Sequence, residues 1–386
     1  MPRPALRSFL LLAAFVLAAA FAAEPAYAQG VPGAVLSDYQ ARLAEYLQAR
    51  QAYDAEAESY WNAVGDKRRV RNAKRRNHQP IELTDYVLTQ PPLYSGPPRP
   101  IDPLAPGPQP SERPPIPVVA DFLLAAAEQY HFVPQQPASD LDFKRAYARA
   151  AHAAGLTREQ IVGVYAFETG GRGAYNTQAG LEPPGPGKHA VSPALGYNQL
   201  LSTNSVSILA EHGAHVLATL RLKAKPLNGE AKAAMERKIE AVKRMIAFSR
   251  SVPNRWSEHD RLAKSTMGGL GIHAAILDID IGPLLQVQKL LDSVLFARAK
   301  GYAAPLSAAE LELMNLTGDG NGFDMVTMPP AYRLQVPTAN FFQRTGYERN
   351  PVARRTKVVA GLIAEIQGHI NRNSATPGAR DLAAAF

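Results

Sequence analysis

The chain of 386 residues contains no cysteine. This absence excludes disulfide bonds, thiolate metal sites and a lipid-modified N-terminal cysteine. Beyond the N-terminal segment, the sequence also lacks any apolar stretch long enough to span a bilayer. Few segments alternate polar and apolar residues as strands do, and no glycine-rich phosphate loop or nucleophile elbow is present. We therefore expect no cofactor and no membrane span in the mature chain.

The N-terminus has the composition of an export signal. Arg3 and Arg7 precede the apolar run FLLLAAFVLAAAFAA, and the small residues of AYA end at Ala28. A basic start, an apolar run too short for a comfortable membrane span and a small-residue cleavage site are typical of a secretory signal peptide. We predict that residues 1–28 are removed and that the mature protein is periplasmic. A retained N-terminal anchor is the alternative.

Positive charge is concentrated in one segment. The net charge is +8, and KRRVRNAKRR, from Lys67 to Arg76, ends a predicted amphipathic and basic helical segment over residues 29–79. Export argues against nucleic acid as the partner of these cations. Two interpretations remain, namely a solvated helix end and a patch that docks on an anionic envelope surface.

A proline-rich stretch separates this helix from the rest of the chain. Residues 80–117 hold most of the clustered prolines, and proline removes backbone donors and fixes φ. We predict an extended linker there. From residue 118 to 372 the sequence reads almost entirely as helices, with capping boxes at Thr157 and Ser307, so we predict an all-α domain. The tail, residues 373–386, is small and polar, and we expect it to be loose.

The helix that begins at Thr157 ends with a carboxylate on its apolar face. Ile161, Val164, Tyr165 and Glu168 are spaced to share that face, and two glycines follow. A carboxyl held among apolar groups has a raised pKa, as a general acid near neutral pH requires. The alternative is a glutamate at a helix end that turns into solvent.

The next motif favours the catalytic interpretation. After a loop comes SPALGYNQLL, from Ser192 to Leu201. A helix-ending Glu-Thr followed by Ser-x-Ala-x-Gly-x-x-Gln resembles the lysozyme-like lytic transglycosylases, and the resemblance extends over about residues 118–220. It implies a lysozyme-like helical fold. It also implies an enzyme that cuts peptidoglycan strands between N-acetylmuramic acid and N-acetylglucosamine, leaving a 1,6-anhydro sugar.

The resemblance also implies roles for individual residues. Glu168 would be the sole catalytic carboxyl, acting first as acid and then as base. Gln199 would line the cleft and hydrogen-bond the substrate, and Gly196 would let the backbone approach the glycan. The other motif positions would line or buttress the cleft: Thr169, Ser192, Tyr197 and Asn198.

This chain departs from the family pattern in three ways. The loop between Glu168 and Gln199 is longer than usual, Tyr197 and Asn198 replace Leu-Met, and the downstream Tyr-Asn-Ala-Gly motif is missing. The nearest substitute for that motif is GYERNP, in which Tyr347 would hold the acid. Tyr332 is a rival for this role, and an ordinary core tyrosine is the alternative for either residue.

Two other functions remain open from the sequence. A lysozyme that uses water would need a second carboxylate, for which Glu182 and Asp319 are available. A non-catalytic wall-binding or scaffold protein would keep the cleft and tolerate glutamine at position 168. We assign no metal site, although a calcium ion on Asp319, Asn321 and Asp324 of the loop TGDGNGFD is a further alternative.

Overall fold

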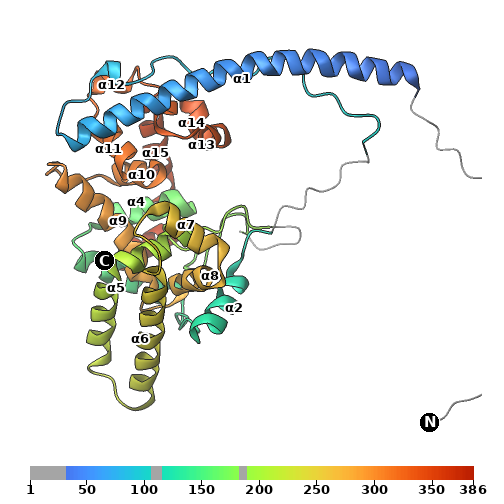
Figure 1. The fold of residues 1–386 in the computed structure, drawn as a ribbon. Helices are drawn as coiled ribbons and strands as arrows, with labels where there is room; N and C mark the ends of the chain where they lie inside the picture. The colour runs from blue at the N-terminus through green and yellow to red at the C-terminus, as the bar shows by residue number, and fades with distance from the viewer. Residues whose placement is uncertain (1–31, 106–114, 182–188) are drawn as a thin grey trace, which may run out of the picture. The chain divides into compact units, whose positions relative to one another are not determined.

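The computed structural model describes residues 32–105, 115–181 and 189–386 (Figure 1). The predicted signal peptide and Glu182 lie outside these residues. The all-α prediction is confirmed, because the described residues form helices and only isolated β-bridges. The chain divides into two units, one within Met1–Ala52 and Tyr94–Pro110 and one formed by Tyr53–Leu93 and Ser111–Phe386.

The helices of the described residues have these bounds: α1 (Gly33–Arg76), η1 (Leu83–Asp85), α2 (Val119–Tyr130), α3 (Asp140–Ala153), α4 (Arg158–Thr169), α5 (Ser202–Ala224), α6 (Gly229–Ser249), α7 (Trp256–Ser265), α8 (Met267–His273), η2 (Ala274–Leu277), α9 (Gly282–Ala299), α10 (Ala308–Thr317), α11 (Asp319–Thr327), α12 (Pro330–Arg333), η3 (Thr338–Phe341), α13 (Arg344–Arg349), α14 (Pro351–Thr356), α15 (Val359–Asn373) and α16 (Pro377–Ala384). Here η denotes a 3₁₀-helix. Figure 1 shows α5 and α6 side by side as a long hairpin.

The first unit is small. It contains the first part of α1, up to Ala52, and the chain from Tyr94 to the last described residue before the gap. The ring of Tyr94 meets the ring of Tyr46 edge-on, with 6.2 Å between centroids, and the guanidinium of Arg50 lies 5.5 Å from the Tyr94 centroid. This part of the proline-rich stretch therefore packs on a helix, whereas we predicted an extended linker.

The second unit includes more of the N-terminal half than the sequence indicated. Residues 53–93 belong to it, and the side chains of Ala57, Val64 and Tyr86 are buried. Arg71, from the basic segment, is fully buried. The interpretation of this segment as a solvated helix end is therefore wrong for Arg71. The predicted domain start at residue 118 leaves out a segment that contributes to the core.

Helix α4 forms as its sequence predicts. The Thr157 hydroxyl accepts from the Gln160 backbone N–H at 3.2 Å, and the Gln160 side chain accepts from the Thr157 N–H at 2.8 Å, so the capping box is confirmed. Ile161, Val164 and Tyr165 have no exposed surface. The helix packs against α10, α15 and α16, and this packing fixes the direction in which its C-terminal end points.

The C-terminal tail is ordered, contrary to our expectation. Residues 377–384 form α16, and Ala379 and Leu382 are fully buried against the core. Before α16, the Thr376 hydroxyl donates to the Gly171 carbonyl at 2.5 Å, and the Asn373 amide donates to the Ala166 carbonyl at 3.0 Å. Small apolar residues at helical spacing explain the packing, and the tail holds the end of α4.

Within the described residues, no single helix is long and apolar enough to cross a membrane. Only the α8–η2 segment and α9 taken together pass the same test of length and composition, and these two are bent by 98° at the break between them.

Candidate functional site

A cavity of about 830 Å³ lies at the C-terminal end of α4. It brings together Glu168, Ser192 and Gln199, which the sequence predicted to share a site, and Asp319, which the sequence offered as a second carboxylate. Its other lining residues are Ala179, Ala194, Leu201, Asn204, Trp256, Lys289, Asn315, Leu316 and Gly318. Its volume falls within the range of ordinary ligand sites.

Glu168 occupies the last turn of α4. The helix ends one residue later, at Thr169, because Gly170 takes a left-handed conformation at φ 61° that favours glycine. The Nδ2 atom of Asn315 on α10 donates a hydrogen bond to Glu168 Oε1 at 2.7 Å. The carboxyl is thus held in one orientation on the cavity wall by a neighbouring helix.

A second carboxyl, that of Glu312, packs against Glu168. Glu312 lies one turn before Asn315 on α10 and has no exposed surface. Among the described residues, neither of its carboxyl oxygens has a donor with good hydrogen-bond geometry, although the Asn315 amide lies near enough to lower its pKa. Because a deeply buried carboxylate without donors is costly, one carboxyl of this pair has to hold a proton.

The electrostatics of the pair follow from this burial. Burial, and then the charge of Glu168, hold the pKa of Glu312 well above its usual range. Burial also raises the pKa of Glu168 to about 7, although Glu312, Asn315 and the Lys289 ammonium act in the opposite direction. Glu168 therefore exchanges its proton near neutral pH, as a general acid must.

Gln199 and Ser192 line the same cavity as Glu168. Gln199 has a positive φ of 44°, and its side-chain Nε2 donates to the carbonyls of Thr177 and Gly196 at 3.1 and 2.8 Å. These bonds fix the amide and leave its oxygen available to accept from a ligand. The Ser192 hydroxyl accepts from the Ala194 N–H at 3.1 Å, which supports a buttressing role.

Three motif residues do not face the cavity. Tyr197 is fully buried and donates to Asp140 at 2.8 Å, and Asn198 bonds to Tyr147 and Gln286. Gly196 has φ 82°, and a Cβ there would lie 3.0 Å from the Gln286 side chain. The prediction that these residues contact substrate is wrong, because their bonds shape the turn that presents Gln199.

Neither tyrosine proposed to hold the acid lines the cavity. Tyr347 is buried against Trp61 and Phe342 in another part of the core, with ring centroids 5.6 and 6.3 Å apart. Tyr332 packs against that same cluster. Asn315 fills the role assigned to a tyrosine. Thr169 is also absent from the wall, and its hydroxyl donates to the Tyr165 carbonyl at 2.7 Å, which secures the last turn of α4.

Four residues at this site were not predicted from the sequence, namely Glu312, Asn315, Trp256 and Lys289. Glu312 and Asn315 are three residues apart on α10 and so share a face. This spacing is common in helices and carries no catalytic signal by itself. Only the packing of α10 on α4 shows that these side chains meet Glu168.

The calcium alternative does not fit the structure. The segment read as a glycine-rich loop is helix α11, and Asp324 forms ion pairs with Arg71 and Arg75. Asp319 accepts from the Ser293 hydroxyl at 2.6 Å, and the Asn321 amide donates to two backbone carbonyls. No group of three metal-ligating side chains occurs within the described residues.

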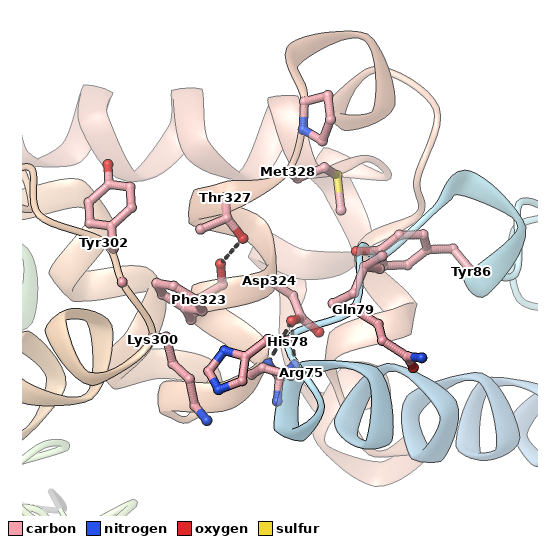
Figure 2. Close-up of a pocket in the computed structure, with 13 residues that line it drawn as sticks. Arg75, His78, Gln79, Tyr86, Lys300, Tyr302, Phe323, Asp324, Thr327 and Met328 are labelled. Atoms are coloured by element: carbon pink, nitrogen blue, oxygen red, sulfur yellow. Dashed lines mark hydrogen bonds and ion pairs between the residues drawn. The ribbon is translucent and has the colours of Figure 1, made fainter.

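Asp324 lines a second, smaller cavity, of about 370 Å³ (Figure 2). Figure 2 shows Arg75 and Asp324 joined by dashed contacts, with His78 and Lys300 beside them. Glu168 is not among its lining residues. The carboxylate in this cavity is neutralised by arginine and offers no free acid.

Searches against protein families, curated proteins and solved structures find no match to this chain. The motif and the geometry of the site therefore carry the functional assignment.

Proposed function

We propose that this protein is an exported lytic transglycosylase, which cuts the bond between N-acetylmuramic acid and N-acetylglucosamine in peptidoglycan. One observation carries the proposal. The half-buried carboxyl of Glu168, whose pKa is raised by desolvation to about 7, lies on the wall of a cavity that also presents Gln199 and Ser192. A positioned proton donor on a ligand-sized cavity is what glycosidic cleavage requires.

The proposed reaction uses Glu168 twice. Its proton goes to the bridging oxygen, the C1–O bond breaks, and the acetamido group of the muramic acid stabilises the charge at C1. The ionised Glu168 then takes the proton of the C6 hydroxyl while that oxygen bonds to C1. The product is a 1,6-anhydro end, no water is consumed, and Glu168 regains its proton.

Glu312 does not supply a second reacting group. In hydrolases, the two carboxyls stand about 5 Å or more apart on either side of the sugar. Glu312 instead lies against Glu168 and is absent from the cavity wall. This arrangement favours the single-carboxyl reaction.

Other wall residues suit an anionic glycan. The Trp256 side chain is 54% exposed on the wall and offers a flat apolar face to a sugar ring. Lys289 makes no ion pair or hydrogen bond among the described residues and lies close enough to affect both glutamates. We propose that its ammonium attracts the carboxylates of muramic acid or its peptide.

Asp319 keeps the lysozyme alternative open. Its side chain lines the same cavity, and the hydrogen bond from Ser293 fixes it there. A fixed carboxylate on this wall could activate a water molecule, in which case the products would carry reducing ends.

Export and envelope docking remain proposals. The basic segment of Lys67 to Arg76 uses Arg71 and Arg75 to bind Asp324, and Lys74 to bind Asp85 at 2.6 Å. The patch proposed for an anionic envelope surface is thus reduced to its exposed cations, such as Arg69 and Arg76.

The test is digestion of purified sacculi followed by mass spectrometry of the products. Anhydro ends are expected, and Glu168→Gln should lower the rate at least about 10²-fold with unchanged circular dichroism. Asp319→Asn should leave the kind of product unchanged. Reducing ends that disappear in Asp319→Asn would establish the lysozyme instead. If the wild-type protein binds sacculi but releases nothing, it is a binding or scaffold protein.

A further inference from the structure

We propose that Glu312 is a positioning residue that keeps its proton throughout the reaction and donates it as a hydrogen bond to Glu168. This inference deepens the proposed function and rests on it for its catalytic meaning. Its physical content, a protonated Glu312 that donates a hydrogen bond to Glu168, can be measured whether or not the protein is an enzyme.

The first argument is that Glu312 is fully buried, and that among the described residues neither of its oxygens has a donor with good hydrogen-bond geometry. The Asn315 amide lies near enough to lower its pKa, but its well-formed hydrogen bond goes to Glu168. A protonated carboxyl has one O–H to donate, and an ionised one can only accept. Glu168 is the group against which Glu312 packs, so the interaction is favourable when Glu312 carries the proton and Glu168 accepts.

The second argument decides which carboxyl stays neutral. Glu168 reaches the cavity and accepts a hydrogen bond from Asn315, and both features favour its ionised form. Glu312 has no contact with the cavity. The direction of the shift at Glu312 agrees, because burial and then the charge of Glu168 hold its pKa well above its usual range.

The helices packed around α10 supply one cation near the pair. Lys289 on α9 acts on both carboxyls and lowers their pKa values. On α11, Asp319 accepts a hydrogen bond from Ser293. On α15, His369 and Glu365 lie 3.3 Å apart and form their own pair. A single ammonium near two carboxyls accounts for one negative charge on the pair, and the other carboxyl stays neutral.

The arrangement has a catalytic consequence. When Glu168 gives its proton to the bridging oxygen, the new carboxylate is met by two donors, the Glu312 O–H and the Asn315 amide. Donors that are already in place stabilise this charge without rearrangement. The Glu312 proton never leaves its oxygen, so the proton balance of the reaction is carried by Glu168 alone.

The experiment is a pH titration by NMR of protein with ¹³C-labelled glutamate carboxyls. We expect one resonance that titrates near pH 7 and is lost in Glu168→Gln, and one that stays protonated at higher pH and is lost in Glu312→Gln. Titration of both groups near the ordinary glutamate pKa of about 4.3 would overturn the proposal.

Two substitutions at position 312 separate positioning from mere packing. Glu312→Gln keeps a donor, so the Glu168 midpoint should stay within about one pKa unit of the wild type. Glu312→Leu removes the donor, and the midpoint should rise by about one unit or more. A midpoint of Glu168 that falls or stays the same in Glu312→Leu would overturn the proposal. If this variant does not fold, the titration of the wild-type protein decides.

The same data separate this inference from the proposed function. If the titrations follow expectation but sacculi are not cleaved, the carboxyl pair exists and the enzyme assignment is wrong. If sacculi are cleaved to anhydro ends but Glu312 titrates normally, the enzyme assignment holds. The claim that Glu312 stays protonated and donates to Glu168 is then wrong.

Discussion

Two helix contacts in the second unit bury carboxyl groups and compensate for their burial in different ways. Where α11 meets α1, Asp324 contacts Arg71 at 3.3 Å and also pairs with Arg75. Where α4 meets α10, Glu168 and Glu312 contact each other, and the fixed hydrogen bond comes from a neutral amide. At Asp324, the arginines neutralise the negative charge. At Glu168 and Glu312, a carboxyl that keeps its proton avoids a second negative charge.

The difference explains why only one of the two places suits acid catalysis. Burial raises the pKa of Asp324, but both arginines pull it back and the pair locks α1 to α11. The guanidinium of Arg71 also lies 4.6 Å from the ring centroid of Tyr86. Glu168 has no such cation bound to it, so its proton remains exchangeable near pH 7. The buried Arg71 stabilises the fold, whereas the buried Glu312 affects the pKa of Glu168.

Breaking the ion pair between Arg71 and Asp324 should have the largest effect on stability. Arg71→Met removes a fully buried guanidinium that also donates to the carbonyls of Asp85 and Asn340 at 3.0 Å. Loss of one partner of a buried pair leaves the other poorly compensated, so we expect the free energy of unfolding to fall by about 3–5 kcal/mol. Urea denaturation measures this change.

A matched control lies two residues away. Arg69 pairs with Asp66 on the surface, and its side chain is 77% exposed. Arg69→Met should change the free energy of unfolding by about 1 kcal/mol or less. Equal effects of the two substitutions would show that residues 53–93 are not part of the folded unit.

The comparison also shows how far the sequence could predict the structure. Local signals were sufficient for α4, because its capping box, its apolar face and the glycines after Glu168 all lie within a few residues. These signals act over short distances in the chain, and no distant residue is needed to interpret them.

The parts that the sequence missed depend on distant partners. Arg71 looked like surface charge because Asp324 lies 253 residues away. Glu312 looked like an ordinary helix residue because its partner is on α4. The tail looked loose because its packing depends on the loop after α4, where the Gly171 carbonyl accepts from the Thr376 hydroxyl. Such tertiary contacts determine which polar groups are buried, and the hydrophobic periodicity of the sequence does not reveal them.

The pH dependence of stability should distinguish the two kinds of buried carboxyl. The folded-state pKa of Glu168, about 7, exceeds its ordinary value of 4.5, so the folded protein binds this proton more tightly. Stability from this group is therefore complete below about pH 4.5 and falls as pH rises to about 7. The loss should be on the order of 3 kcal/mol relative to Glu168→Gln, which has no proton to lose.

Denaturation of both proteins at pH 5 and at pH 7.5 provides the measurement. The wild type should lose more stability than Glu168→Gln over this interval. The opposite sign, with the wild type gaining relative to the variant, would mean that Glu168 is bound as an ordinary stabilised carboxylate, like one that has an arginine partner.

The smallest expected effect concerns Asn315. Its neutral amide contacts Glu168, whereas Asp324 is contacted by arginines. Asn315 donates to Glu168 Oε1 at 2.7 Å and so favours its ionised form. Asn315→Leu keeps the volume and removes the donor, so the pKa of Glu168 should rise from about 7 by about one unit. Because the acid must be protonated to act, the alkaline limb of the pH–rate profile should move to higher pH by the same amount. Asn371→Leu, at an exposed position on α15, is the control and should leave the limb in place. A limb that moves to lower pH in Asn315→Leu would mean that the amide stabilises the protonated carboxyl, and Glu168 would then depend on Lys289 for its ionised form.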